Sequence, residues 1–481
     1  MGHAYSSIIA DFFARFKSID DYNVHFLTGT DEHGLKIQRS AEKAGQDPKE
    51  FCDQISQTFK DLSQTLNLSN TDFIRTTEDR HKKTVQHLWS LLEKNDDIYL
   101  SNYSGWYSVS DEAFYNEDEI EEIDGKKISI SSKSTVEWIE EESYFFRLSK
   151  WEKPLLDFYE KNPNFISPES RKNEVISFVK SGLKDLSVSR KTFSWGIQVP
   201  NDKNHVIYVW LDALTNYLSA LNYPNKNDEL FKKFWPASIH LIGKDILRFH
   251  AVYWPAFLLA AKIQPPKKVY GHGWILAGDE KMSKSKGNIL DPLQIIEEYG
   301  LDPLRYYLIK EVSFGNDGNI SQDRLEDCIN SDLANNYGNL CQRVTAFAIK
   351  NCDGKIPEKI KFEEDDLIIL DKFKDNLETI RSKIDQQNLN YYIDYIVNSL
   401  FEANKYFNDQ EPWKKKNDIT RLNTIVFTSL EIIRKISFLL YPIIPGSVLK
   451  ALKIFNLSEN DIKLEDISKN EFLIKGNSIN K

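Results

Sequence analysis

The stretch Lys281-Met282-Ser283-Lys284-Ser285, followed by Lys286-Gly287-Asn288, is the segment around which the rest of this chain is organised. Its three lysines fall within six residues. Serine competes for backbone hydrogen bonds and Gly287 removes backbone restraint, so the stretch is a poor helix and a poor strand. A lysine ammonium offers three donors to a phosphate chain. The stretch therefore predicts a cationic loop that closes over a triphosphate, whereas a generic Lys/Ser-rich pentamer would be a solvated loop.

Length and composition indicate a globular protein of two to three domains. The chain has 481 residues, 41% hydrophobic and 28% charged, which is ordinary for such a protein. No apolar run approaches the ~18 residues of a membrane span, and the start lacks a signal-peptide pattern. The net charge of -10 argues against nonspecific coating of nucleic acid but does not exclude an RNA enzyme.

The cysteines indicate a reducing compartment. The four, with no C-x-x-C pair among them, are Cys52, Cys328, Cys341 and Cys352. They are typical of reduced thiols in a cytoplasmic protein and not of a disulfide or zinc framework.

Alternating apolar strands and amphipathic helices predict an α/β fold with a parallel sheet. A helix is expected over 4–17 and a strand over 24–27, with Asp31-Glu32-His33-Gly34 following the strand at its carboxyl end. Ligands bind at that end of parallel sheets, so Asp31 is a candidate ligand, although it could also cap a helix. Residues 206–210 are expected to resume the sheet.

Helix starts are expected where Asp precedes Pro. Asp47-Pro48, Asp291-Pro292 and Asp302-Pro303 each combine an N-cap with proline at the first helical position. After residue 320 the pattern is wholly helical and predicts a bundle. We therefore expect four segments: 1–101 and 150–320 as the two halves of a Rossmann-like domain, 102–149 as an insertion of short strands, and 321–481 as the bundle.

Seven short motifs resemble those of the methionyl-tRNA synthetases, which are class I aminoacyl-tRNA synthetases, and they occur in that family's order. They are Met1–Ala4, Thr28–Gly34, Trp210–Ala213, Gly243–Ile246, the KMSKS motif Lys281–Ser285, Asn339–Arg343 and Glu411–Trp413. The resemblance covers nearly the whole chain. It implies a Rossmann-like catalytic domain with a connective insertion, followed by an α-helical anticodon-binding domain.

The activity that this resemblance implies is that of a methionine–tRNA ligase. Methionine reacts with ATP, accompanied by Mg²⁺, to give methionyl-adenylate and pyrophosphate, and methionine is then transferred to the 3′-terminal ribose of tRNA(Met), including the initiator tRNA. The attacking carboxylate is already ionised at neutral pH, so activation needs alignment and charge neutralisation but no general base. The chain stops without an appended tRNA-binding module, and we expect a cytoplasmic monomer.

Residue roles follow from the same resemblance. Gly2 and His3 resemble the end of the His-x-Gly-His motif that contacts ATP, and Lys281 and Lys284 resemble the lysines that stabilise the transition state. Asp31 resembles the carboxylate that holds the α-ammonium group of methionine. The residues that match the methionine pocket are Trp210, Ala213, Tyr217, Ile246, His250 and Trp254. Leu214 departs from the proline often found after the alanine. An aromatic pair at helical spacing is more often core, and His250 could be a buried, hydrogen-bonded ring.

Three residues match the anticodon readers. Trp413 can stack on an unpaired base, while Asn339 and Arg343 can form hydrogen bonds to base edges. Pro412-Trp413 could equally be a turn with a core tryptophan.

Two departures from the family pattern are visible. Many members hold zinc through cysteine pairs in the insertion, but the corresponding stretch 105–111 contains none, so no structural zinc is expected and the chain resembles the metal-free subgroup. The family's first strand and first histidine should precede Gly2, so the chain resembles an N-terminally truncated member. We expect an upstream, in-frame extension that supplies that strand.

Other functions remain as alternatives. Synthetases for isoleucine, valine or leucine carry a large editing domain, for which 102–149 is too short, and the cysteine enzyme needs zinc ligands that are missing. A noncatalytic tRNA-binding paralogue is the alternative of a different class. Pyrophosphate exchange with methionine would separate these.

Overall fold

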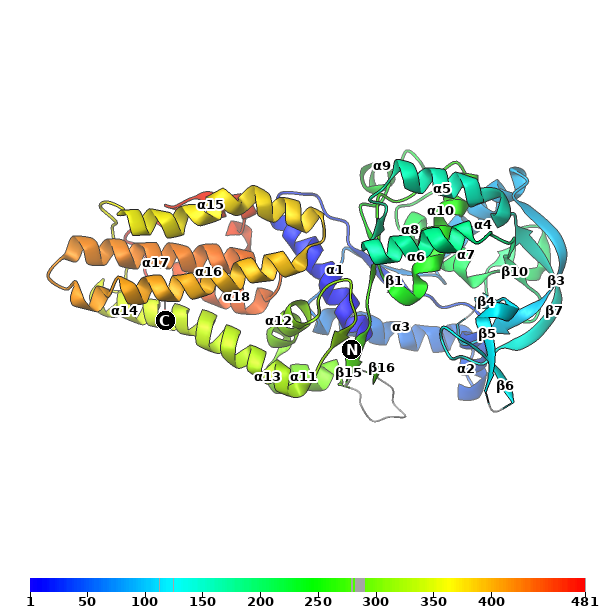
Figure 1. The fold of residues 1–481 in the computed structure, drawn as a ribbon, viewed down its shortest axis with the longest axis horizontal. Coiled ribbons are helices and arrows are strands. Elements are labelled where there is room, and N and C mark those ends of the chain that lie inside the picture. Colours follow the sequence, from blue (N-terminus) through cyan, green and yellow to red (C-terminus); the bar gives the residue numbers. More distant parts are fainter. Residues whose placement is uncertain (112, 124, 278–279, 282–289, 481) are drawn as a thin grey trace. The chain divides into compact units, whose positions relative to one another are not determined.

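The computed structural model describes residues 1–480 other than 112, 124, 278–279 and 282–289, and of residues 103, 114, 277, 280 and 281 it describes the backbone alone. The chain divides into two units, which are Met1–Val24 with Gly273–Lys481, and His25–His272 (Figure 1). The division into four segments remains a prediction.

Parallel strands in residues 25–272 confirm the α/β class. The register of β1 and β2 runs from Leu27↔Asp72 to Thr30↔Arg75, and a second parallel sheet has the order β13-β14-β8. The bounds are β1 Leu27–Thr30, β2 Asp72–Arg75, β8 Ile166–Ser167, β13 His240–Gly243 and β14 Val269–His272. The first strand begins at Leu27, at the end of the predicted range 24–27.

Helices connect and flank these strands, and α3 begins at the N-cap that the sequence predicted. Asp47 caps α3, and its carboxylate accepts hydrogen bonds from the backbone N–H of Lys49 and Glu50, as predicted. The bounds are α2 Leu35–Ala44, α3 Pro48–Thr65, α4 Asp79–Lys94, α5 Glu152–Lys161, α6 Glu169–Lys180, α7 Val209–Leu214, α8 Asn216–Ser219, α9 Glu229–Phe234, the 3-10 helix η3 Lys244–Ile246, the π-helix η4 Phe249–Tyr253 and α10 Trp254–Ala260.

An antiparallel sheet of order β4-β3-β7-β9 interrupts the α/β pattern. Its two long strands pair from Ile98↔Phe146 to Tyr107↔Glu137. The bounds are β3 Ile98–Ser108, β4 Ala113–Tyr115, β7 Glu137–Phe146 and β9 Leu186–Ser187, with a separate hairpin of β5 Ile120–Ile123 and β6 Lys126–Ser129.

The prediction that residues 206–210 resume the parallel sheet is wrong. The strand there is β12 Asp202–Ile207, which pairs antiparallel with β10 Ser189–Arg190 and β11 Gln198–Val199 in a sheet of its own. Helix α7 already begins at Val209, so Trp210 is helical. A short apolar run cannot distinguish a buried strand from the start of a buried helix.

The unit formed by residues 1–24 and 273–481 contains the expected first helix. In α1, Gly2–Ile19, the side chains of Phe12 and Phe16 are buried, and each ring meets Tyr392 edge-on. The other elements before the bundle are β15 Ile275–Ala277, β16 Glu280–Lys281, α11 Pro292–Tyr299, α12 Leu301–Glu311 and β17 Gly318–Asn319. Asp291 caps α11 as predicted, but α12 starts before Asp302, whose carboxylate instead accepts from the backbone N–H of Ser447.

The predicted helical bundle is confirmed. Its longest helices, α15, α16 and α17, run alongside one another (Figure 1). The bounds are α13 Gln322–Cys328, the π-helix η6 Ile329–Gly338, α14 Asn339–Asn351, α15 Glu364–Asp385, α16 Leu389–Asp409, α17 Ile419–Leu440 and α18 Pro445–Leu452, with short 3-10 turns at η7 Pro412–Lys414 and after α18. Across the described part of the chain, no helix combines the length and apolar character needed to cross a membrane.

Candidate functional site

Asp31 lies in the loop after β1, at the carboxyl end of that strand, and is exposed. Helix α2 begins four residues later, and its N-cap is Gly34, with φ of 106° and no side-chain hydrogen bond to the cap. The N-cap interpretation of Asp31 is therefore wrong, and its role as a ligand stays a prediction.

Buried polar side chains beside Asp31 hold this loop in place. The carboxylate of Glu32 accepts two hydrogen bonds from the Arg75 guanidinium, at 2.7 Å and 2.9 Å, and one from the Thr77 hydroxyl at 2.6 Å. A bidentate arginine–carboxylate pair is among the strong hydrogen-bonded contacts in proteins. Sequence analysis missed Arg75, because nothing in its local pattern shows that β2 brings it beside the loop after β1.

The predicted pocket residues lie together in residues 25–272. The indole of Trp210 stacks on Phe249, with ring centroids 3.8 Å apart and planes 6° apart. Trp254 and His250 both lie near Tyr217, with centroids 6.2 Å and 5.8 Å from its ring.

Hydrogen bonds assign the proton of His250. Its Nδ1 lies 3.0 Å from the carbonyl oxygen of Ile246, an acceptor only, so Nδ1 carries the hydrogen. Nε2 therefore accepts from the Tyr217 hydroxyl at 2.8 Å. The structure thus connects Ile246, His250 and Tyr217 in one chain of hydrogen bonds. His250 is therefore a buried, hydrogen-bonded ring, and it also contacts the rings of Trp210 and Tyr217.

His240 also belongs to this cluster, although sequence analysis missed it. Its ring stacks on Tyr217 at 3.8 Å, and its Nε2 accepts a hydrogen bond from the Trp254 indole N–H at 3.3 Å. Ala213 follows Trp210 by one turn of α7 and is buried. Leu214, which departs from the family pattern, is buried as well. His240 lies three residues before Gly243, which opens the predicted motif Gly243–Ile246, and this proximity is the signal that could have identified it.

We expect acid to destabilise residues 25–272 through His250. Burial lowers the pKa of His250 from 6.5 to about 4. Between these values the unfolded chain binds a proton that the folded chain does not. The stabilisation is therefore present above pH ~6.5 and declines towards pH ~4, by roughly 2 kcal/mol between pH 7 and pH 4.5. Urea unfolding at both pH values would measure it, and His250→Gln should lose less stability on acidification; an equal loss would contradict the assignment.

The predicted ATP contacts belong to the other unit. Helix α1 starts at Gly2, and a Cβ added there would meet no atom of the described residues within 4 Å, so packing does not explain this glycine. His3 is exposed in the first turn. Lys281 is known by its backbone alone, which pairs with Leu276 in the β15–β16 ladder. Lys284 lies outside the described residues.

The predicted anticodon readers lie at one end of the bundle helices. Asn339 begins α14, and one turn later Arg343 donates a hydrogen bond to the side chain of Asn408 at 2.6 Å. Its guanidinium lies 5.6 Å from the centroid of the Phe407 ring, and that ring meets Trp413 edge-on at 6.2 Å. Trp413 is 41% exposed, so it is not a core tryptophan.

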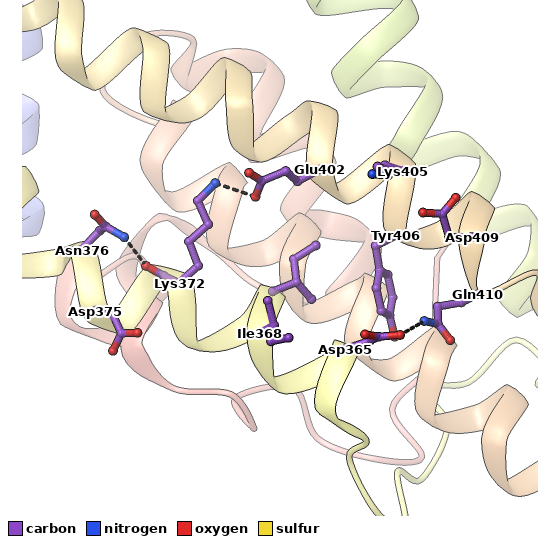
Figure 2. Close-up of a pocket in the computed structure, with 11 residues that line it drawn as sticks. Asp365, Ile368, Lys372, Asp375, Asn376, Glu402, Lys405, Tyr406, Asp409 and Gln410 are labelled. Carbon is purple, nitrogen blue, oxygen red and sulfur yellow. Dashed lines mark hydrogen bonds and ion pairs between the residues drawn. The ribbon is translucent and has the colours of Figure 1, made fainter.

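A groove of about 560 Å³ lies between α15 and α16 and shares no residue with the predicted sites (Figure 2). Its lining contains the lysines 372 and 405 among four carboxylates. The carboxylates belong to Asp365, Asp375, Glu402 and Asp409. A lining with an excess of negative charge does not suit a phosphate or an RNA backbone.

Comparison with known proteins identifies the family. The family described as tRNA synthetases class I (M) matches residues 1–126 and 123–345. A methionine–tRNA ligase of Brucella suis is 49% identical over 97% of this chain and 91% of its own length, and one of Rickettsia bellii is 50% identical over 94% and 89%.

Solved structures agree with these sequence relatives. Mycobacterium tuberculosis methionyl-tRNA synthetase in complex with methionyl-adenylate matches with a TM-score of 0.97 and 44% identity, over 100% of this chain and 95% of that chain. Its apo form matches with a TM-score of 0.90 and 41% identity. The chain belongs to the methionyl-tRNA synthetase family of class I aminoacyl-tRNA synthetases.

Proposed function

We propose that this chain is a methionine–tRNA ligase, which activates methionine with ATP and transfers it to the 3′-terminal ribose of tRNA(Met). The observation that carries the proposal is the cluster of Trp210, Tyr217, His250 and Trp254, in a chain so similar to a synthetase solved with methionyl-adenylate. A soft thioether packs well against aromatic faces, which suits this cluster to a methionine side chain.

Neutral His250 orients the polar end of the pocket. Because its Nε2 accepts from Tyr217, the Tyr217 hydrogen is engaged and the hydroxyl oxygen is left as an acceptor. The exposed Asp31 carboxylate, beside the rigid Glu32–Arg75 pair, holds the substrate ammonium. Ala213, Ile246 and Trp210 complete the pocket.

ATP with Mg²⁺ is the second substrate. Gly2 leaves open space at the start of α1 for a close approach, and His3 is exposed beside it. Lys281 and Lys284 neutralise the negative charge that develops on the pyrophosphate. Enzymes commonly catalyse reactions at phosphates in this way, by positioning and charge stabilisation and not by a nucleophilic side chain. The substrate carboxylate needs no general base because it is already ionised.

No structural zinc takes part in this proposal. In the stretch 105–111, the Asp111 carboxylate accepts hydrogen bonds from the hydroxyls of Tyr115, Ser132 and Ser134. The stretch contains no cysteine or histidine, the residues from which structural zinc sites are mainly built. We further propose a cytoplasmic monomer that also serves initiator tRNA, for which light scattering and charging of both tRNAs are the tests.

Exchange of labelled pyrophosphate into ATP tests the activation step. Methionine should support exchange, and leucine, isoleucine or valine at equal concentration should not. Exchange absent with methionine, together with tight binding of tRNA(Met), would instead favour the noncatalytic tRNA-binding paralogue.

Trp413→Ala should impair tRNA charging but not methionine activation. Loss of one stacked base costs about 1–3 kcal/mol, so kcat/KM for tRNA(Met) should fall by roughly 5- to 150-fold. Phe401→Ala is the matched control, because Phe401 is an exposed aromatic ring of the same bundle, on α16, and at 65% it is more exposed than Trp413. Equal loss in exchange and in charging would mean that Trp413 supports the fold instead.

A further inference from the structure

Asp212 is a fully buried carboxylate that two histidines contact from different elements. Its Oδ2 lies 2.7 Å from Nδ1 of His33, and its Oδ1 lies 2.7 Å from Nε2 of His81. Asp212 and His81 have no exposed surface, and His33 is 4% exposed. Nδ1 of His81 in turn contacts the Ser219 hydroxyl at 2.9 Å. One carboxylate thus joins the loop after β1 to helices α4, α7 and α8.

This carboxylate is charged in the folded protein. Burial alone would raise the pKa of Asp212, but the contacts with His33 and His81 lower it below its ordinary value. A buried ion is costly, and well-packed apolar side chains often stabilise a fold as well or better. A gain in stability therefore does not explain why a charged carboxylate is buried at this position. The location of Asp212 relative to the substrate site suggests its role.

Asp212 stands between the two halves of the methionine site. It lies between Trp210 and Ala213 on α7, while its partner His33 lies two residues after Asp31. Trp195 also holds this loop: its indole donates to the Glu32 carbonyl at 2.6 Å, and its backbone carbonyl accepts from the Gly34 N–H at 3.1 Å. The Asp212–His33 bond is thus a direct side-chain link between the loop that carries Asp31 and the helix that carries the pocket.

We propose that Asp212 is a positioning residue for methionine, which acts through His33 to set the place of Asp31 relative to Trp210 and Ala213. This inference rests on the proposed function. A displacement of about 1 Å in a positioned group is enough to lose much of a charged contact. The link therefore governs how well the site holds the ammonium group, and not how well it holds the thioether.

Two ligands separate these effects. Methionine carries the ammonium group, and 4-(methylthio)butanoate is the same molecule without it. Their dissociation constants can be measured by quenching of tryptophan fluorescence. Asp212→Asn retains one acceptor oxygen and replaces the other with an NH₂ group, so the side chain can no longer accept from both His33 and His81 and also loses its charge. We expect methionine to bind about tenfold or more weakly while the analogue changes little. The dissociation constant of the analogue divided by that of methionine should therefore decrease.

His33→Gln provides an independent test, because it removes the loop side of the link and retains the bond between Asp212 and His81. His33→Gln should reduce the same ratio. It also keeps the proposal testable if Asp212→Asn does not fold. Equal weakening of both ligands in the folded variants, or an unchanged ratio in His33→Gln, would overturn the positioning role.

Asp97→Asn is the matched control. Asp97 is also a buried carboxylate of residues 25–272, 2% exposed, but its partners are Lys150 at 2.8 Å and the Trp151 indole at 3.1 Å. This variant should lower the melting temperature and leave the ligand ratio unchanged. Failure of the wild-type chain to bind methionine would refute the proposed function itself, a result distinct from wild-type binding with no effect in the variants.

Discussion

Lys284→Ala is expected to slow the formation of methionyl-adenylate by about 100-fold or more, which is the scale for losing one preorganised charge at a transition state. The dissociation constant of methionine should remain nearly unchanged, because the lysine acts on the phosphates and not on the amino acid. Single-turnover measurement of adenylate formation, with methionine binding measured in parallel, would check both parts.

Lys286→Ala is the matched control for this prediction, since it removes the same charge from the same stretch of sequence. It should have the smaller effect. Unchanged turnover in Lys284→Ala, or equal losses in the two variants, would contradict the assigned role of Lys284 and reduce the stretch to a general cationic loop.

Asp11→Ala is expected to lower the free energy of unfolding by about 3–5 kcal/mol, because it leaves buried positive charge without its partner. Asp11 has no exposed surface and contacts two guanidinium groups, at 2.6 Å from Arg305 and 2.8 Å from Arg15. Arg305 is equally buried, and burial lowers its pKa while Asp11 opposes that effect. Urea unfolding followed by circular dichroism would measure the loss.

The double variant Asp11→Ala/Arg305→Met separates an unpaired charge from lost packing. Removal of the second partner should recover part of the stability lost in Asp11→Ala, since the coupling between contacting residues makes their effects non-additive. A loss below about 1 kcal/mol in Asp11→Ala would show that water or other groups satisfy the arginines.

Local signals predicted local structure well in this chain. Asp47 and Asp291 cap the helices that their sequences predicted, because a cap is a hydrogen bond within a few residues. The same reasoning failed at Asp302, and the alternative interpretation of Asp31 as a cap is wrong as well. At these positions a glycine precedes or replaces the expected cap, and Asp302 accepts instead from Ser447, which is 145 residues away.

The strand expected at 206–210 failed for a related reason. Its apolar run predicted burial correctly, and residues 206–209 are indeed buried. Burial does not specify the partner, however, and backbone pairing with β10 and β11 made this strand antiparallel and ended it before Trp210.

The sequence by itself determined the fold class and the family, because short motifs carry these through residue type and order alone, and it predicted the pocket residues by the same resemblance. Only the tertiary structure decided which polar groups contact the predicted pocket residues and the loop that carries Asp31. His240, the Glu32–Arg75 pair and Asp212 with its histidines are joined across strands and helices that are distant in sequence. Hydrogen bonds and buried charges depend on distances of about 3 Å between side chains, and such distances exist only once the chain is packed.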